Sequence, residues 1–437
     1  MSVTSDSEAA VLRKISRRLL PFLFTLYIVN YLDRVNVGFA ALQMKSDLKL
    51  SDSVYGFGAG IFFAGYLLFQ VPSNLVLLRV GARRWLSVLM IAWGIISCGM
   101  MLVHSPATFY SCRFLLGAAE AGFFPGIILY LTYWFPLSAR AGSISGFMTA
   151  MPLSGVIGGP ISGALLSLNG KSGIAGWQWL FLVEGAPAII LGVVVWFVLS
   201  DSPQHAAWLD SKERECLDAA LKRESVPTSS EHRSFFTHII LRPETWLLSA
   251  AYFTLLWASL GVGLWLPEMV KSFSGYSDLM VGIISTIPFL ASFALMSFVG
   301  ARSDKTRKPH LFFAGCTFAG ATGFLLTVIS HNVLLSTLFL SLAVAGVHSA
   351  FGPFWAMPGR FLAGPTAAAG IAFINSLGNC GGFFGPFVGG LVKQRTGSFV
   401  AGTFVLAGVL CISGILALTL RARQNDARTT ESVSSNN

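Results

Sequence analysis

The sequence predicts an all-α integral membrane protein with twelve transmembrane helices, arranged as two pseudo-symmetric six-helix bundles. Three observations support this fold class: an apolar composition, a series of apolar runs of about 20 residues each, and a glycine-proline pattern that recurs in both halves of the chain. Of the 437 residues, 54% are hydrophobic and only 11% are charged, whereas a soluble domain carries about 25% charged residues. So few charged residues cannot cover the surface of a protein that is surrounded by water. Most of the surface is therefore expected to face lipid.

Charge and cysteine content exclude several function classes. The formal net charge is +10, but the positive residues lie in short loops between apolar runs, which indicates membrane topology and not a nucleic-acid groove. The six cysteines are scattered and form no CxxC pair, so neither a metal site nor a disulfide framework is predicted. Because the sequence also lacks HExxH and GxSxG motifs, we expect no cofactor and no enzyme activity.

The apolar runs define the predicted domains. The first run is too long for a signal peptide and contains Pro21, Asp33 and Arg34, so we expect it to remain as the first helix. The runs begin near Leu19, Val54, Trp85, Thr108, Ser143, Trp179, Trp246, Leu279, His310, Val333, Ala367 and Phe399. The predicted domains are a tail at 1–18, a bundle at 19–200, a central loop with a surface helix at 201–244, a second bundle at 245–420 and a tail at 421–437.

The positions of the Lys and Arg residues predict the orientation. Most of the 30 basic residues lie in the two terminal tails, the even-numbered loops and the central loop. Both termini are therefore predicted to be cytoplasmic, which requires an even number of spans. We expect a monomeric multi-pass protein of the bacterial inner membrane, with the lipid bilayer around it.

Two segments with the same glycine-proline pattern lie at a constant offset along the chain. The fifth predicted helix contains GVIGGPISG at 155–163, and the eleventh contains GGFFGPFVGG at 381–390. The same offset places Asn74, before the loop between helices 2 and 3, on Gly300 of the segment GARSDKTRK between helices 8 and 9. Parallel six-helix halves are one of the known transporter designs.

These features resemble the major facilitator superfamily, whose fold is a pair of six-helix bundles. The segment GARSDKTRK is similar to that superfamily's loop signature, and the resemblance implies a gating role for Arg302, Asp304 and Arg307. The equivalent loop between helices 2 and 3 departs from the signature, because Leu78 and Asn74 replace the usual acidic residue and glycine. The resemblance therefore supports gating by the loop between helices 8 and 9.

Four further segments carry a closer resemblance. They are YLDRVNVGFA at 31–40, RFLLGAAEAGFFPGIILYLTYWFP at 113–136, GPFWAMPGRFL at 352–362 and AAAGIAFINSLGNCGG at 367–382. They resemble the anion:cation symporter family, especially its bacterial tartrate, phthalate, hydroxyphenylacetate and sugar-acid permeases. In that family a helix 1 acid and a helix 4 glutamate are proton sites, and an arginine holds the substrate carboxylate. The resemblance assigns these roles to Asp33, Glu120 and Arg34, with Arg113 as a partner.

The same four residues stand out on physical grounds. Asp33 and Arg34 lie inside the first predicted helix, and Arg113 and Glu120 inside the fourth. A charge at the bilayer centre costs about 2.5 kcal/mol or more, so such residues are functional candidates. The directions of the two helices place both sets at similar depth, where they can meet across a cavity. Glu120 follows Arg113 by two turns and so lies on the same face.

The sequence leaves the pairing of these charges open. Asp33 and Arg34 are consecutive and cannot share one helix face. In one arrangement Arg34 points to the substrate and Asp33 to Arg113; in the other the roles are reversed. The alternative without function is a buried ion pair that never touches substrate, although buried ion pairs stabilise poorly.

The C-terminal half offers weaker candidates. Aligning AEAGFFP with VHSAFGP places His348 on Glu120, which predicts that His348 faces the central cavity; the alternative is a packed histidine. Asn375 and Asn379 are one turn apart and could bind substrate hydroxyls or hold two helices together. Glu184 and Glu268 lie near predicted helix ends, and we expect them to be solvated or to cap their helices.

The leading functional hypothesis is proton-coupled uptake of a small carboxylate such as tartrate, a sugar acid or an aromatic acid. Arginine matches a carboxylate through two parallel hydrogen bonds, and protons carried by Asp33 and Glu120 would offset the charge of the anion. The second hypothesis is efflux or exchange of organic anions, which the glycine-proline pattern at 155–163 supports. A membrane-embedded sensor or enzyme is a remote third.

Overall fold

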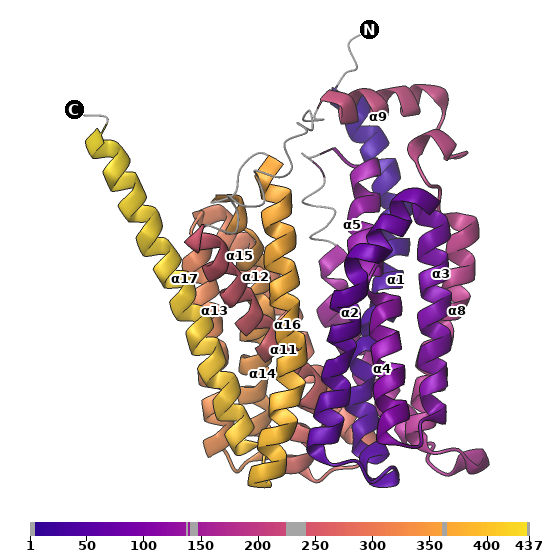
Figure 1. The fold of residues 1–437 in the computed structure, drawn as a ribbon, viewed down its shortest axis with the longest axis vertical. Coiled ribbons are helices and arrows are strands. Elements are labelled where there is room, and N and C mark those ends of the chain that lie inside the picture. Colours follow the sequence, from indigo (N-terminus) through magenta and orange to yellow (C-terminus); the bar gives the residue numbers. More distant parts are fainter. Residues whose placement is uncertain (1–4, 137–138, 140–146, 224–241, 361–364, 435–437) are drawn as a thin grey trace.

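The computed structural model describes residues 5–136, 139, 147–223, 242–360 and 365–434. Two groups of helices lie side by side (Figure 1). The first group, called the N half, contains α1 (Ser5–Asp47), α2 (Asp52–Val80), α3 (Ala82–Gly99), α4 (Pro106–Glu120), α5 (Phe123–Trp134), α7 (Ala150–Leu166) and α8 (Gly176–Val198). The second group, called the C half, contains α11 (Pro243–Ser274), α12 (Asp278–Thr306), α13 (Pro309–Ile329), α14 (Val333–Ser349), α15 (Phe351–Trp355), α16 (Pro365–Thr396) and α17 (Val400–Ser434).

In the described residues these helices make the twelve predicted passes, with α4 and α5 forming one pass and α14 and α15 another. Nine of those passes are long and apolar enough to cross a membrane; α1, α7 and α16 complete the set. The helix start predicted near Ser143 and the loop residues 224–241 lie outside the described part. The start of α1 and the end of α17 lie at one end of the bundle, called the terminal end, and the opposite end is called the distal end (Figure 1).

Local sequence signals explain several helix ends at the distal end. Ser51 caps α2 through its hydroxyl group, and Ser105 forms a capping box with Thr108 at the start of α4. The side chain of Asn332 caps α14 by accepting hydrogen bonds from the N–H groups of Leu334 and Leu335. These side chains accept hydrogen bonds from backbone N–H groups that have no partner inside the helix. Gly275 ends α11 with a φ of 66°, a conformation that glycine adopts without strain.

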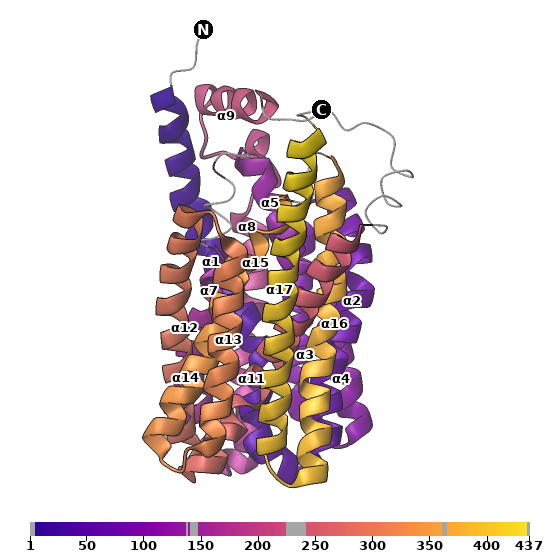
Figure 2. The ribbon, with the colours of Figure 1, turned by 90° about the vertical axis from the view of Figure 1, so that its left-hand side faces the viewer.

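A surface helix, α9 (Ser211–Arg223), covers the terminal end of the N half (Figures 1 and 2). The sequence predicted a surface helix in this loop, and the structure confirms it. Glu213 contacts Lys14 at 2.7 Å, and Arg223 contacts Glu8 at 2.9 Å. Residues of α1 that precede its apolar run thus pair with α9, so α1 is already helical within the predicted 1–18 tail.

The C-terminal helix also extends beyond its apolar run. The sequence predicted a tail from residue 421, whereas the backbone of α17 stays helical to Ser434. Figure 2 shows this helix running along the outside of the C half.

At the distal end the two halves approach backbone to backbone. Helix α2 packs along α16, and α7 packs along α12. A Cβ atom at Gly56 would collide with the Pro386 carbonyl and crowd Gly390, and Gly159 and Gly282 face each other in the same way. Only glycine leaves room for such close approach. The repeated glycine pattern therefore forms the contact surface between the halves.

Candidate functional site

An ion pair between α1 and α4 lies inside the N half. Arg34 donates to Glu120 Oε2 from Nη2 at 3.0 Å and from Nε at 3.4 Å. Asn30 Nδ2 donates to the same oxygen at 3.0 Å. The Glu120 side chain is fully buried, while that of Arg34 is 12% exposed. The charges of the first and fourth predicted helices therefore do meet, as the sequence predicted.

Aromatic rings support the Arg34 guanidinium. Its Cζ lies 5.1 Å from the ring centre of Tyr66 and 5.5 Å from that of Phe62. Cations are attracted to ring faces, so these contacts help to hold the guanidinium group in place. A second carboxylate could therefore replace Glu120 while the guanidinium stays where it is.

Arg113 is buried, and no carboxylate of the described residues contacts it. Nη2 donates to the Ala59 carbonyl at 3.4 Å, and Cζ lies 4.9 Å from the ring centre of Phe62. Its Nε and Nη1 atoms have no hydrogen-bond partner in the described part of the chain. A buried donor without a partner costs about 1–3 kcal/mol, and more when it is charged. The role of Arg113 in substrate binding stays a prediction.

Asp33 points away from the arginines. Ser97 Oγ donates to its Oδ1 at 2.7 Å, and Asn36 Nδ2 donates to the same atom at 3.4 Å. Its Oδ2 atom has no partner among the described residues. Neither arrangement considered from the sequence is present: Arg34 pairs with Glu120 of α4, and Asp33 forms no ion pair with Arg113 in the described residues.

His348 lies in the C half at the position that matches Glu120. Both residues lie in the last turn before a break in a pass: α4 ends at Glu120, and α14 ends at Ser349. The His348 ring is buried, stacks on Phe289, and its Nδ1 lies 3.2 Å from Ser292 Oγ. It thus has a packing partner and a hydrogen bond within its own half.

The remaining predicted residues occupy two places. Asn379 Nδ2 donates to the Asn375 carbonyl at 2.8 Å along α16, and both side chains are half-buried. Arg302, Asp304 and Arg307 are exposed at the terminal end of α12, where Arg307 ends the helix with a φ of 55°. The roles of these five residues stay predictions.

Four charges at the distal end form a cluster that the sequence did not reveal. We call it the distal charge cluster: Lys45 and Asp52 from the N half, and Glu268 and Lys393 from the C half. Lys45 contacts Glu268 at 3.0 Å, and Lys393 contacts Asp52 at 3.0 Å, so both bonds cross between the halves. Within each half, Lys45 also pairs with Asp52, and Lys393 with Glu268. The halves can therefore separate without leaving a charge unpaired.

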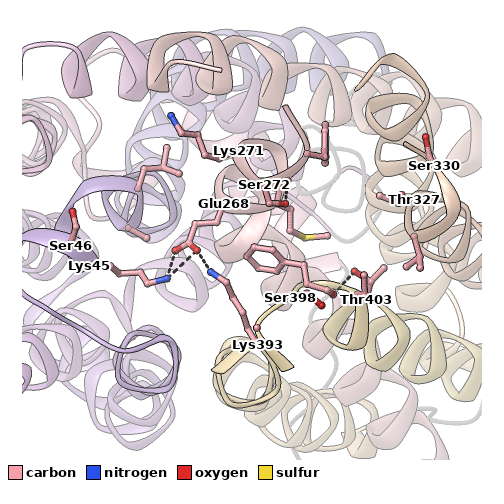
Figure 3. A pocket seen from close by; sticks show the side chains of 18 residues that line it. Lys45, Ser46, Glu268, Lys271, Ser272, Thr327, Ser330, Lys393, Ser398 and Thr403 are labelled. Atoms are coloured by element: carbon pink, nitrogen blue, oxygen red, sulfur yellow. Dashed lines mark hydrogen bonds and ion pairs between the residues drawn. The ribbon is translucent and has the colours of Figure 1, made fainter. Parts of the chain in front are cut away.

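The distal charge cluster borders a pocket of about 630 Å³ (Figure 3). Glu268 lies between Lys45 and Lys393 on one side of this pocket, and Ser398 and Thr403 lie on another. Arg34, Arg113 and His348 do not line it. The pocket is thus separate from the candidate substrate residues.

Two glutamates correct the sequence interpretation. Glu184 and Glu268 were expected to be solvated or to cap helices, and that expectation is wrong. Both are buried: Glu184 accepts a hydrogen bond from Ser162 at 2.6 Å, and Glu268 belongs to the distal charge cluster. The sequence places Lys45 and Lys393, on two other helices, at the same predicted depth as Glu268. These two lysines could have indicated that Glu268 is buried in an ion pair.

Replacing Glu268 with glutamine is expected to favour separation of the distal ends. The change removes one of the two cross-half bonds and leaves Asp52 facing two lysines. Since a hydrogen bond to a charged group contributes about 1.5–3 kcal/mol, the population with separated ends should rise roughly tenfold or more. Spin-label distances between Ser53→Cys and Gln394→Cys in a background without native cysteines would measure it.

The matched control is Lys271→Gln. Lys271 lines the same pocket, and its partner is Asp278 Oδ1 in the same half at 3.0 Å. The cross-half hydrogen bond from Gln43 goes to the other oxygen, Asp278 Oδ2, so the variant leaves that bond in place and should keep the wild-type distance distribution. An unchanged distribution in Glu268→Gln would show that the cluster does not hold the ends together.

Known proteins resemble this chain over nearly its full length. A family profile described as "Major Facilitator Superfamily" matches residues 23–362 and 274–435. A "Putative tartrate transporter" of Agrobacterium vitis is 47% identical over 418 residues, 96% of this chain and 96% of that protein. A "Quinolone resistance transporter" of Acinetobacter baumannii is 37% identical, over 97% of this chain and 98% of that protein.

Solved structures share the fold. A bacterial homologue of the human lysosomal transporter Spinster, in an inward-facing and unoccupied conformation, superimposes with a TM-score of 0.73. The two sequences are 16% identical, and the alignment covers 96% of each chain.

Proposed function

This chain belongs to the Major Facilitator Superfamily, and from that premise we propose that it imports a small organic anion together with protons by alternating access. It is a membrane transporter and not an enzyme. We propose the bacterial inner membrane as its location, with both termini in the cytoplasm, because most basic residues lie on the side of the termini. The distal end then faces outward.

The observation that carries this proposal is the Arg34–Glu120 pair beside Arg113. One guanidinium is paired with a carboxylate that another carboxylate could replace, and a second guanidinium has two donors without a partner among the described residues. Arginine binds carboxylates through two parallel hydrogen bonds. The proposed substrate class is therefore a carboxylate, either hydroxylated such as tartrate or a sugar acid, or aromatic. The relative named for tartrate transport supports the first of these.

Proton coupling follows from the same exchange. A substrate carboxylate that occupies Arg34 displaces Glu120, which then lies buried without a cation in direct contact and takes up a proton. An anion that enters against an interior-negative potential costs about 2.3 kcal/mol per charge per 100 mV, and co-transported protons offset that cost. Asp33 is the second proposed proton carrier.

Uptake into inside-negative vesicles tests the proposal. Labelled tartrate should accumulate when the outside is acidic, and an uncoupler should abolish the accumulation. A competition series of hydroxylated, aromatic and unsubstituted carboxylates would then define the substrate class. Tartrate accumulation that does not change with the proton gradient would contradict symport.

A second candidate function is efflux or exchange. The glycine-proline pattern around Gly159 and Pro160 supports it, as does the relative named for quinolone resistance. In the vesicle assay this candidate predicts loss of preloaded substrate when the proton gradient is applied from outside.

Replacing His348 with alanine is expected to change substrate preference. If the ring faces the substrate, as the match with Glu120 predicts, its loss removes one polar contact, and the affinity for hydroxylated carboxylates should fall about tenfold relative to unsubstituted ones. Competition profiles measure the ratio. Ser292→Ala is the control, since it removes the ring's hydrogen bond but keeps the ring; equal profiles in wild type and His348→Ala would assign His348 to packing.

A further inference from the structure

Two side chains of α1 donate to the same oxygen of Glu120. Asn30 Nδ2 lies 3.0 Å from Glu120 Oε2, and Arg34 Nη2 lies 3.0 Å from that atom as well. Asn30 precedes Arg34 by four residues, so the two side chains lie on one face of the helix. The other oxygen of Glu120, Oε1, has no hydrogen-bond partner among the described residues. The proton exchange proposed above uses Arg34 and Glu120 but gives Asn30 no role.

Asn30 and Arg34 differ in charge and in exposure. Asn30 is 0% exposed, whereas the Arg34 side chain is 12% exposed. A dissolved carboxylate can therefore reach Arg34, while Asn30 is sealed from solvent and has no charge to attract an anion. When Arg34 turns to another anion, Asn30 is the hydrogen-bond partner that Glu120 keeps in the described part of the chain.

Glu120 needs different partners in its two protonation states. An ionised carboxylate only accepts hydrogen bonds, whereas a carboxylic acid also donates one through its O–H group. A buried O–H group without an acceptor is costly. A guanidinium group cannot be that acceptor, because its nitrogens only donate. The acid form of Glu120 therefore requires a partner of another kind than Arg34.

The amide group of Asn30 suits both states of Glu120. It carries two N–H donors on Nδ2 and an acceptor, Oδ1. Oδ1 is buried and has no donor among the described residues. The terminal torsion of asparagine is broad and roughly two-fold, so half a turn of the amide exchanges its donor and acceptor ends with little change of shape. A contact that served packing alone would leave this buried acceptor empty at a cost.

The other charged or titratable side chains around Glu120 come from α1, α2 and α4. Arg34 is the one cation in direct contact with Glu120 among the described residues. Asp33 turns toward α3, Arg113 donates to a backbone carbonyl of α2, and the ring of Tyr66 faces Arg34. Loss of Arg34 thus leaves Glu120 beside a neutral amide with no cation in contact, which favours its protonated form.

We propose that Asn30 is a positioning residue whose amide group follows the protonation state of Glu120. While Glu120 is ionised, Nδ2 donates to its carboxylate, as in this structure. When Glu120 loses Arg34 and takes a proton from water, the amide rotates and Oδ1 accepts the new O–H. Asn30 itself neither gains nor loses a proton. Release of Arg34 by substrate rests on the proposed function, whereas the response of the amide to the proton does not.

Infrared spectroscopy of Arg34→Met without substrate tests the response of the amide alone. Methionine keeps an unbranched side chain but has no charge and no donor, so Glu120 should become protonated. Relative to wild type, the carbonyl stretch of a carboxylic acid should appear, and the amide carbonyl stretch of Asn30 should move to lower frequency. Labelling with 13C-asparagine identifies the amide band, which should be missing when Asn30→Leu is added.

The control for this measurement is the double variant Arg34→Met with Glu120→Met. It has neither the cation nor the carboxyl group, so it should show neither spectral change. Thermal unfolding checks that each variant is folded, and Arg34→Ala replaces Arg34→Met if the latter is not.

Two outcomes overturn the proposal. If the acid band appears while the Asn30 amide stretch stays in place, the amide does not follow the proton and Asn30 is a structural contact. If no acid band appears, Glu120 stays ionised without Arg34, and the amide has no proton to follow.

Tartrate added to the wild-type protein tests the substrate-linked step. Both spectral changes should appear together on binding, whereas Asn30→Leu should bind tartrate in calorimetry without the amide change. Asn36→Leu is the matched control, because it removes another buried amide of α1 that contacts Asp33 at 3.4 Å; it should keep both changes. Tartrate that binds wild type without moving the amide band overturns the proposal. If Arg34→Met shows both changes but tartrate does not bind, the amide response stands and the proposed substrate class fails.

Discussion

Replacing Arg34 with alanine is expected to abolish substrate binding. A carboxylate held by two charge-assisted hydrogen bonds loses about 1.5–3 kcal/mol for each, so affinity for the carboxylate should fall at least about 100-fold. Calorimetric titration of purified protein with tartrate measures this directly. Arg34→Lys keeps the charge but not the planar pair of donors, and it should bind with intermediate affinity.

The loss of Arg34 also affects stability, and the two effects must be separated. Alanine leaves Glu120 buried without its cation, and breaking one side of a buried ion pair destabilises by about 3–5 kcal/mol unless the survivor takes a proton. The double variant Arg34→Ala with Glu120→Gln removes both charges and should recover most of the stability without recovering binding. If Arg34→Ala still binds tartrate, the Arg34–Glu120 ion pair has a structural role and does not bind the substrate.

Replacing Glu120 with glutamine is expected to uncouple transport from the proton gradient. Glutamine keeps the shape of the side chain and can still accept hydrogen bonds from Arg34 and Asn30, but it cannot carry a proton. Exchange of labelled for unlabelled substrate across a vesicle membrane should continue. Steady-state accumulation should fall by about 50-fold for each proton lost at a gradient of about 100 mV.

The matched control is Glu213→Gln, which makes the same chemical change on α9, where Glu213 contacts Lys14 at the surface. It should accumulate substrate like wild type. Accumulation in Glu120→Gln that still follows the pH gradient would remove Glu120 from the proton path.

The sequence predicted the passes and the contact between the first and fourth helices, but not the pairing of individual charges. Depth along a helix follows from residue count, which is why charges of the first and fourth helices could be expected to meet, although the expected partners were Asp33 and Arg113. The direction of each side chain was open because Asp33 and Arg34 are neighbours. In the structure Asp33 turns toward Ser97 of α3 and Asn36 of the next turn of α1.

The errors at Glu184 and Glu268 have one physical cause. A position near the end of a single helix is solvated only if no other helix covers it, and helix length along the sequence does not report that cover. Glu268 is covered because the halves meet at the distal end, and Glu184 because α7 and α8 pack together. Likewise, α1 is helical before its apolar run because Glu8 and Lys14 find partners on α9.

The glycine contacts between the halves have a kinetic consequence. Gly56 contacts Gly390, and Gly159 contacts Gly282, through main-chain atoms. Glycine has no side chain, so no rotamer has to be selected when these contacts form. These helix contacts can therefore separate and form again without any change of side-chain conformation at the glycines.

When the halves separate, the salt bridges of the distal charge cluster must break together with cross-half hydrogen bonds such as Gln43–Asp278 and Tyr55–Leu264. Because the salt bridges join full charges, the rate of separation should depend on salt concentration.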